Sequence, residues 1–86
     1  MSFGIKVKSR VLKNLEKFPK NIKQKMEEVI LTLKENPLPY LKYDLIKMQG
    51  YDNTYRIRIG KVRMIFKVDF KNKIVEILDA DYRGRI

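Results

Sequence analysis

The segment YRIRIGKVRMIFKVD, residues 55–69, constrains the fold more than any other part of the chain. Apolar and polar side chains alternate on both sides of Gly60 and Lys61, which predicts two antiparallel strands joined by a two-residue turn. In that register Arg58 lies opposite Arg63. The apolar face is expected to carry Tyr55, Ile57, Ile59, Val62, Met64, Phe66 and Val68. The other face is expected to carry Arg56, Arg58, Arg63, Ile65 and Lys67.

The residues before this hairpin predict one strand and two helices. Alternation in FGIKVK, residues 3–8, is typical of a strand with one buried face. Apolar residues at helical spacing predict a helix capped by Ser9 and running to about Phe18. Pro19 interrupts the pattern, and a second helix is expected from Lys20 to about Glu35.

The remaining segments complete a small α+β domain. Residues 38–54 could hold a short strand or stay irregular, and a last strand is predicted over Ile74–Ala80. We therefore expect the order β-α-α-β-β-β in a single domain covering residues 1–86. About four antiparallel strands would form a twisted sheet against the helical hairpin.

Arginines on one sheet face need an explanation, because opposed like charges destabilise a strand pair by a few tenths to about 1 kcal/mol. The chain has 20 Lys and Arg against 10 Asp and Glu, a net charge of +10. Lysines occur throughout, whereas every arginine except Arg10 lies from Arg56 onward. Arginine's planar fork suits bidentate binding of phosphate. A solvated basic face is the alternative, but the clustering favours a site for a polyanion such as nucleic acid.

Missing residue types exclude several kinds of site. The sequence has no Cys and no His, which removes disulfides, thiolate nucleophiles, the usual zinc ligands and the usual neutral-pH acid–base group. No apolar run approaches the roughly 18 residues that span a bilayer, and the N-terminal residues lack a signal-peptide core. We expect a cytoplasmic protein without a membrane partner.

The tyrosines offer stacking or proton-handling groups. Tyr55 belongs to the predicted core. Tyr40, Tyr43 and Tyr51 lie in predicted loops and could stack on bases, although partial burial is the role expected of each. Tyr82, between Asp81 and Arg83, is the tyrosine that we expect to stack on a base or handle a proton.

The whole chain resembles the RelE/ParE superfamily of toxins from toxin–antitoxin pairs, and within it the archaeal RelE branch. The resemblance rests on the element order, the K-x-x-G loop at Lys47–Gly50, and the motifs YRIRIG, VRMIFKVD and DADYRGRI. It implies a small antiparallel sheet around two helices with an open concave face. It also implies a ribosome-dependent endoribonuclease that cleaves mRNA in the decoding site through attack by the ribose 2′-OH, without metal or cofactor.

The resemblance also implies roles for individual residues. By position, Arg56 and Arg58 match the family's two strand cations, Arg63 its strand arginine and Arg83 its C-terminal arginine. Arg85 lies close enough to Arg83 to share its role. The expected catalytic residues are Arg56, Arg58, Arg63, Arg83, Arg85 and Tyr82. The expected substrate-binding residues are Lys47, Lys61 and Lys67.

The general base departs from the family pattern. Some relatives have lysine where this chain has Arg58, and arginine holds its proton too firmly to act as a base. Lys61, Lys47, Asp79 and Asp81 are possible substitutes. Many bacterial relatives also carry a tyrosine after the C-terminal arginine, and in this sequence none follows Arg83.

Partners and alternatives follow from the same resemblance. Toxins of this superfamily are held inactive by an antitoxin, so we expect an acidic, amphipathic, RelB-like partner in a heterotetramer, besides the ribosome and mRNA. One alternative is a ParE-like poison of DNA gyrase. Another is an RNA-binding module without catalytic activity.

Overall fold

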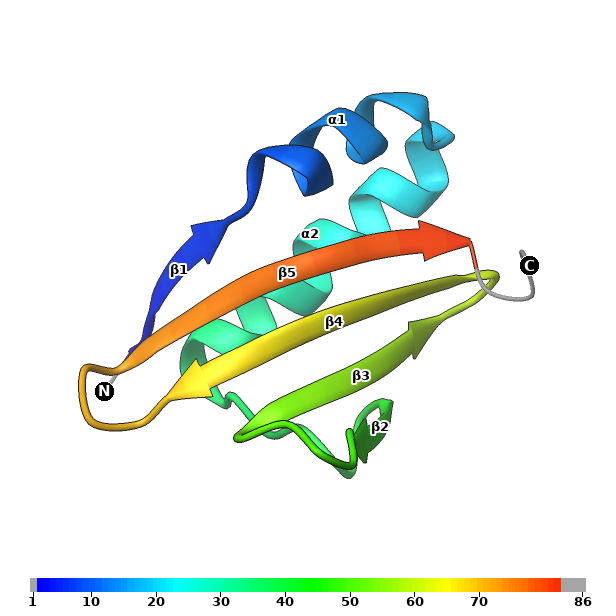
Figure 1. The fold of residues 1–86 in the computed structure, drawn as a ribbon. Coiled ribbons are helices and arrows are strands. Elements are labelled where there is room, and N and C mark those ends of the chain that lie inside the picture. Colours follow the sequence, from blue (N-terminus) through cyan, green and yellow to red (C-terminus); the bar gives the residue numbers. More distant parts are fainter. Residues whose placement is uncertain (1, 83–86) are drawn as a thin grey trace.

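Two helices lie on one side of a sheet in the computed structural model, which describes residues 2–82 (Figure 1). The elements are β1 (Gly4–Val7), α1 (Ser9–Lys17), α2 (Lys20–Glu35), β2 (Asp44–Lys47), β3 (Thr54–Ile59), β4 (Val62–Asp69) and β5 (Ile74–Tyr82). The α+β class and the expected order of helices and strands are confirmed. Neither helix is long and apolar enough to cross a membrane within these residues.

The sheet differs from the expectation in two respects. It has five strands in the order β1-β5-β4-β3-β2, because the connecting segment contains the short strand β2. It is mixed rather than antiparallel, because β1 pairs parallel to β5 with Val7 opposite Ile77. Alternation within a short segment shows that it is a strand but not which neighbour it pairs with or in which direction.

The β3–β4 hairpin has the register predicted from its sequence. Arg58 lies opposite Arg63, and Ile59, Ile57 and Tyr55 pair with Val62, Met64 and Phe66. Gly60 has φ of 59°, the left-handed backbone that a tight hairpin turn requires and that glycine adopts without strain. The hairpin therefore fixes which side chains share a face.

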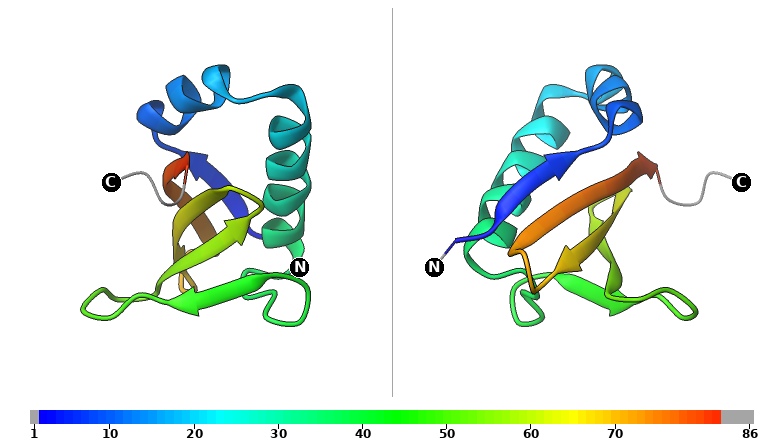
Figure 2. Two further views of the ribbon diagram at one scale, coloured as in Figure 1. Left: turned by 90° about the vertical axis from the view of Figure 1, so that its right-hand side faces the viewer. Right: turned by 60° about the vertical axis from the view of Figure 1, so that its left-hand side comes forward.

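The core lies between the sheet and the helices. Figure 2 shows these layers from two further directions. All seven apolar hairpin residues expected in the core are buried, and Val11, Met26 and Leu33 of the helices pack against them. The bounds of α2 are those predicted. The predicted cap is wrong, because Lys8 takes the cap position of α1 and Ser9 is already helical.

Beyond the end of β1, helix α1 forms hydrogen bonds with the edge of β5. The Nε of Arg10 donates a hydrogen bond to the carbonyl oxygen of Leu78 at 2.9 Å. One turn later, the Nδ2 of Asn14 donates to the carbonyl oxygen of Ala80 at 3.0 Å. Side-chain donors of a helix thus satisfy carbonyls that a neighbouring strand would otherwise pair with.

Candidate functional site

The sheet face that α2 does not cover carries three rows of cross-strand neighbours. The hairpin row consists of Asp44, Arg58, Arg63 and Asp81. The middle row consists of Ile46, Arg56, Ile65 and Asp79. The far row consists of Thr54, Lys67 and Glu76. Neighbours within a row are about 4.8 Å apart and successive rows about 7 Å apart. The arginines therefore lie on β3 and β4, and the carboxylates of these rows lie on the flanking strands β2 and β5.

Arg58 has a partner within its own chain. One of its guanidinium nitrogens, Nη1, lies 3.7 Å from Oδ2 of Asp44. Both side chains are about half exposed, at 46% and 60%, so water screens the pair and it contributes little to stability. This contact holds the Arg58 side chain on the outer face, but it is weak enough for Arg58 to exchange Asp44 for another anion.

Arg56 and Arg63 are placed differently. The Nε of each is buried and has no hydrogen-bond partner. No carboxylate within residues 2–82 forms an ion pair with either guanidinium at 4.0 Å or less. The two residues are diagonal neighbours on adjacent strands, close enough for long side chains to meet. Unsatisfied buried donors are rare in folded proteins and need a specific reason. An anion bound between them would provide that reason.

The two aspartates on β5 turn toward their own backbone. Asp81 accepts a hydrogen bond from the Tyr82 N–H at 2.8 Å, and Asp79 accepts one from the Ala80 N–H at 2.9 Å. Asp81 is the cross-strand neighbour of Arg63 without reaching ion-pair distance. The positive charge of the arginines on β3 and β4 is therefore only partly compensated.

The other predicted site residues are scattered. Lys67 shares the face in the far row, and Lys61 lies in the exposed hairpin turn. Lys47 pairs with Tyr55, so alternation places it on the helix side of the sheet edge. Tyr82 also belongs to the helix side, because its ring packs edge-on against Phe18 at 5.2 Å. The structure thus does not bring Lys47 or Tyr82 to the arginines. Arg83 and Arg85 lie outside the described residues.

Tyr55 cannot serve as a base near neutral pH. Burial raises the pKa of its hydroxyl above the ordinary value, and the nearby Tyr40 raises it further. Its ring stacks on Phe66 in the core, with 5.8 Å between centroids. Tyr55 therefore has a structural role, as its place in the alternating pattern predicted.

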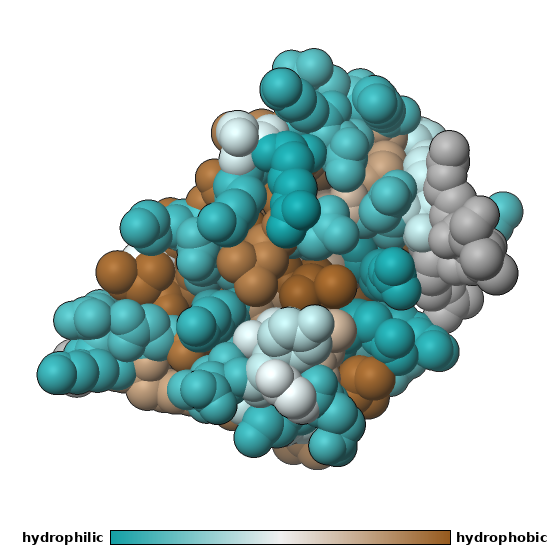
Figure 3. Space-filling model, viewed as in Figure 1, coloured by the Kyte–Doolittle hydropathy of each residue, from teal (hydrophilic) through white to brown (hydrophobic). Residues whose placement is uncertain are grey.

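Sequence reasoning missed two contributors to this face. Arg10 lies far from the hairpin in sequence, yet α1 brings it beside β5. Asp44 comes from a segment whose strand was left open, and its pairing with Arg58 could not be derived from local pattern. Figure 3, which views the molecule as in Figure 1, shows an apolar patch at the centre of this face with hydrophilic side chains around it.

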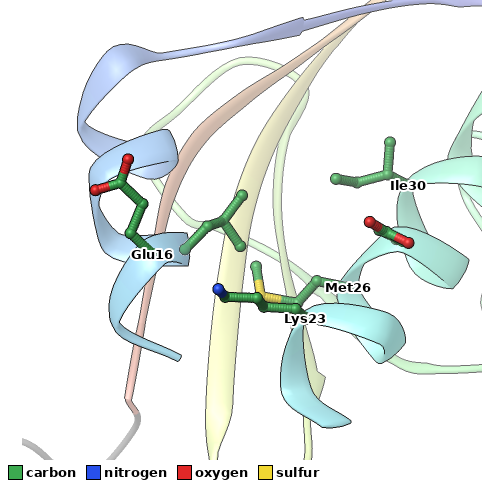
Figure 4. Close-up of a pocket in the computed structure, with 6 residues that line it drawn as sticks. Glu16, Lys23, Met26 and Ile30 are labelled. Carbon is green, nitrogen blue, oxygen red and sulfur yellow. The ribbon is translucent and has the colours of Figure 1, made fainter. Parts of the chain in front are cut away.

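A second surface feature lies between the helices. Figure 4 shows a groove with Glu16 of α1 on one side and Lys23, Met26 and Ile30 of α2 on the other. Its lining combines apolar side chains with charges of both signs. This groove is formed by the helices and is separate from the arginine rows.

Comparison with known proteins shows which family the chain belongs to. A sequence model described as the ParE toxin of the type II toxin–antitoxin system parDE matches residues 5–86. The chain belongs to the RelE/ParE toxin superfamily. Within that superfamily, it is 40% identical over 77 residues to the putative toxin RelE1 of Methanocaldococcus jannaschii, covering 90% of this chain and 86% of that protein. It is 36% identical over 59 residues to toxin RelE3 of the same organism, covering 67% of each.

Solved structures of the superfamily share the fold. The archaeal RelE–RelB complex from Pyrococcus horikoshii OT3 contains a chain with a TM-score of 0.90 and 34% identity, and the match covers 100% of both chains. The isolated E. coli RelE toxin gives a TM-score of 0.82, covering 99% of this chain and 88% of that one. Its identity is 16%, so that likeness concerns the fold alone.

Proposed function

We propose that this protein is the toxin of a RelBE-type pair and that it cleaves mRNA bound to the ribosome. The observation that carries the proposal is the pair Arg56 and Arg63, each with a buried Nε that has no partner. Folding alone does not favour like charges on one sheet face, whereas a phosphodiester between them would accept hydrogen bonds from both guanidinium groups. The RelE names of the relatives support the same function.

The chemistry requires no metal. The ribose 2′-oxygen attacks the adjacent phosphorus, the bond from phosphorus to the 5′-oxygen breaks, and the products are a 2′,3′-cyclic phosphate and a 5′-hydroxyl. The proton leaves the 2′-oxygen for a base, and another proton reaches the departing 5′-oxygen. Negative charge builds up on the phosphoryl oxygens between these steps. Arg56 and Arg63 would stabilise that charge, with Arg58 joining them when it leaves Asp44.

Arg83 and Arg85 enter the proposal through sequence position. Each follows β5, whose last described residues flank the hairpin row. A guanidinium arriving there would add to the positive charge around Arg63. The hairpin row holds two carboxylates, and Asp44 already lies against Arg58. We therefore propose Asp81 as the group that takes the 2′ proton.

Cleavage of mRNA on a programmed ribosome tests the proposal. Primer extension should show cuts with the unchanged protein and at least about a hundredfold fewer with Arg63→Ala, the usual loss on removing a donor that stabilises the transition state. Arg83→Ala should also reduce cutting. Lys47→Ala is the matched control, because Lys47 lies on the other side of the sheet. If both arginine variants cut as well as the parent, the catalytic assignment is wrong.

A gyrase poison is the second candidate, because the matching family model carries the ParE name. It predicts DNA breaks and intact mRNA after expression. The arginines on the sheet face favour the ribonuclease, since inhibition of a topoisomerase has no evident need for a phosphate site there. Measuring mRNA decay and DNA breaks in the same cells separates the two functions.

An antitoxin partner forms part of the proposal. Several matched structures are complexes of RelE with RelB. The net charge of +10 and the apolar groove lined by Leu15, Met26 and Ile30 favour an acidic, amphipathic chain that folds on binding. We expect a heterotetramer, and co-expression with the neighbouring gene followed by light scattering tests this stoichiometry.

A further inference from the structure

A recess beside the arginines is shaped by an irregularity in β5. The pairing of β4 with β5 shifts register between Ile65 and Phe66, so that Ile65 pairs with Asp79 and Phe66 with Ile77. Leu78 is the extra residue of this bulge. In a regular strand Asp79 would face the core, but the bulge returns it to the outer face next to Leu78. An apolar and an acidic side chain therefore lie side by side opposite Ile65.

The bulge is held in place from both sides. Arg10 of α1 donates to the carbonyl oxygen of Leu78, which the shifted ladder leaves at the strand edge. The Ala80 N–H donates to the carboxylate of Asp79. These bonds fix the position of the two side chains before any ligand arrives, which reduces the entropy lost on binding.

The opposite wall comes from the loop between β2 and β3. The Met48 N–H donates to the carbonyl oxygen of Thr54 at 2.8 Å, and the hydroxyl of Thr54 donates to the carbonyl oxygen of Asp52 at 2.9 Å. These contacts bring the loop over the far row and bury Thr54. Tyr51 in this loop is 63% exposed, so its ring is available to a ligand.

We propose that this recess binds one nucleobase of a single-stranded RNA and that Asp79 selects a base with an amino group over uracil. The inference rests on the proposed ribonuclease function. The recess is lined by Arg10, Met48, Tyr51, Thr54, Ile65, Leu78 and Asp79 and encloses about 230 Å³.

The lining matches the chemistry of a base. Ile65, Leu78 and Met48 offer an apolar floor for a ring face, and a tyrosine beside such a floor is a common stacking partner for bases in RNA-binding proteins. A carboxylate only accepts hydrogen bonds, with about four lone-pair positions, of which the Ala80 N–H uses one. Guanine offers two adjacent donors on its Watson–Crick edge, whereas uracil offers one donor between two carbonyl oxygens that a carboxylate repels.

The position of the recess fits a nucleotide whose phosphate lies between Arg56 and Arg63. Ile65 is the cross-strand neighbour of Arg56, and Arg63 is one row away on the same strand as Ile65. One row corresponds to about 7 Å, which is roughly one nucleotide along an extended strand. A base in the recess would therefore fix which phosphodiester meets the arginines.

Binding of mononucleotides tests the site without cleavage. Methyl NMR signals of Ile65, Leu78 and Met48 should shift on addition of GMP, with affinity roughly five- to a hundredfold above that for UMP, the range for one good side chain–base pair. Asp79→Asn keeps an oxygen for the Ala80 N–H but adds a donor, so the preference should fall to unity or reverse. Glu76→Gln makes the same charge change on the same face and is the control. It should leave the preference for GMP over UMP unchanged.

The outcomes separate the site from the nuclease. If mRNA is cut but neither Asp79→Asn nor Tyr51→Ala changes the base preference in mononucleotide binding or at cut sites, the recess assignment is overturned while the nuclease stands. If no mRNA is cut but GMP still binds with the expected preference, the base site stands and the nuclease fails. Shifts confined to the groove between α1 and α2 would also overturn the inference.

Discussion

Replacing Arg63 with methionine should make the protein more stable while it removes the proposed activity. Arg63→Met removes the charge opposite Arg58, which releases about 0.2–1 kcal/mol. It also removes the buried Nε that has no hydrogen-bond partner. Such a donor lowers the stability of the fold by about 1–3 kcal/mol when it is fully excluded from water. Because the rest of the guanidinium reaches water, we take the lower end of that range. Methionine retains a long apolar stem to cover the sheet.

The expected gain is therefore about 1–2 kcal/mol in the free energy of unfolding, and each 1 kcal/mol corresponds to a rise in Tm of about 4–8 °C for a domain of this size. Urea unfolding followed by circular dichroism measures it. Lys67→Met makes the same charge change on the same strand and face at an exposed position, so it should alter stability by no more than about 0.5 kcal/mol.

Two results would refute this reasoning. If Arg63→Met unfolds at lower urea than the parent, Arg63 contributes to the fold, and its placement needs no ligand to explain it. If both methionine variants gain equally, the effect comes from the net charge of the protein rather than from the pairing. Raising the salt concentration should shrink the part of the gain that comes from repulsion with Arg58, because salt screens exposed charges.

Two further predictions concern acidic residues near the turns and edges. Asp44→Asn frees Arg58 from its half-exposed partner, so an uncleavable RNA should bind roughly two- to fivefold more tightly in a fluorescence titration. The stability of this variant should stay within about 0.5 kcal/mol of the parent. Unchanged affinity for RNA would contradict this role of Asp44. In the turn after β4, bonds from the side chain and backbone N–H of Asn72 hold the pKa of Asp69 below its ordinary value of 3.8. Stability from this contact is present above that value and is lost as the pH falls through the folded pKa. Asn72→Ala should therefore lower the urea midpoint at about pH 7, and this effect should shrink as the pH is lowered into the acid range.

The β3–β4 hairpin is a part of the fold that could be predicted in full from the sequence. Alternation from Tyr55 to Val68 and the glycine at position 60 fixed the strands, their register and the residues of each face, because period-two alternation and a two-residue turn leave one consistent pairing. The helical spacing of apolar residues likewise gave the bounds of α2. These are local signals, and the structure agrees with them.

Contacts between distant segments were beyond such reasoning. The parallel pairing of β1 with β5, the bulge at Leu78 and the bond from Arg10 all depend on how elements pack in three dimensions. The bulge changes the face of Asp79, so strict alternation assigns the wrong side to the acidic residue that lines the recess. The unpartnered Nε atoms of Arg56 and Arg63 could likewise be found only from the arrangement of their neighbours.

Direct observation of the arginine Nε–H groups by NMR tests the central claim, that Arg56 and Arg63 together hold a phosphodiester. The protein labelled with ¹⁵N would be titrated with a short RNA whose 2′-hydroxyls are methylated, so that binding occurs without cleavage. We predict that the Nε–H signals of Arg56 and Arg63 shift together and with the same apparent Kd, while that of Arg10, already bonded to Leu78, shifts less. RNA binding that leaves both signals in place would contradict the account.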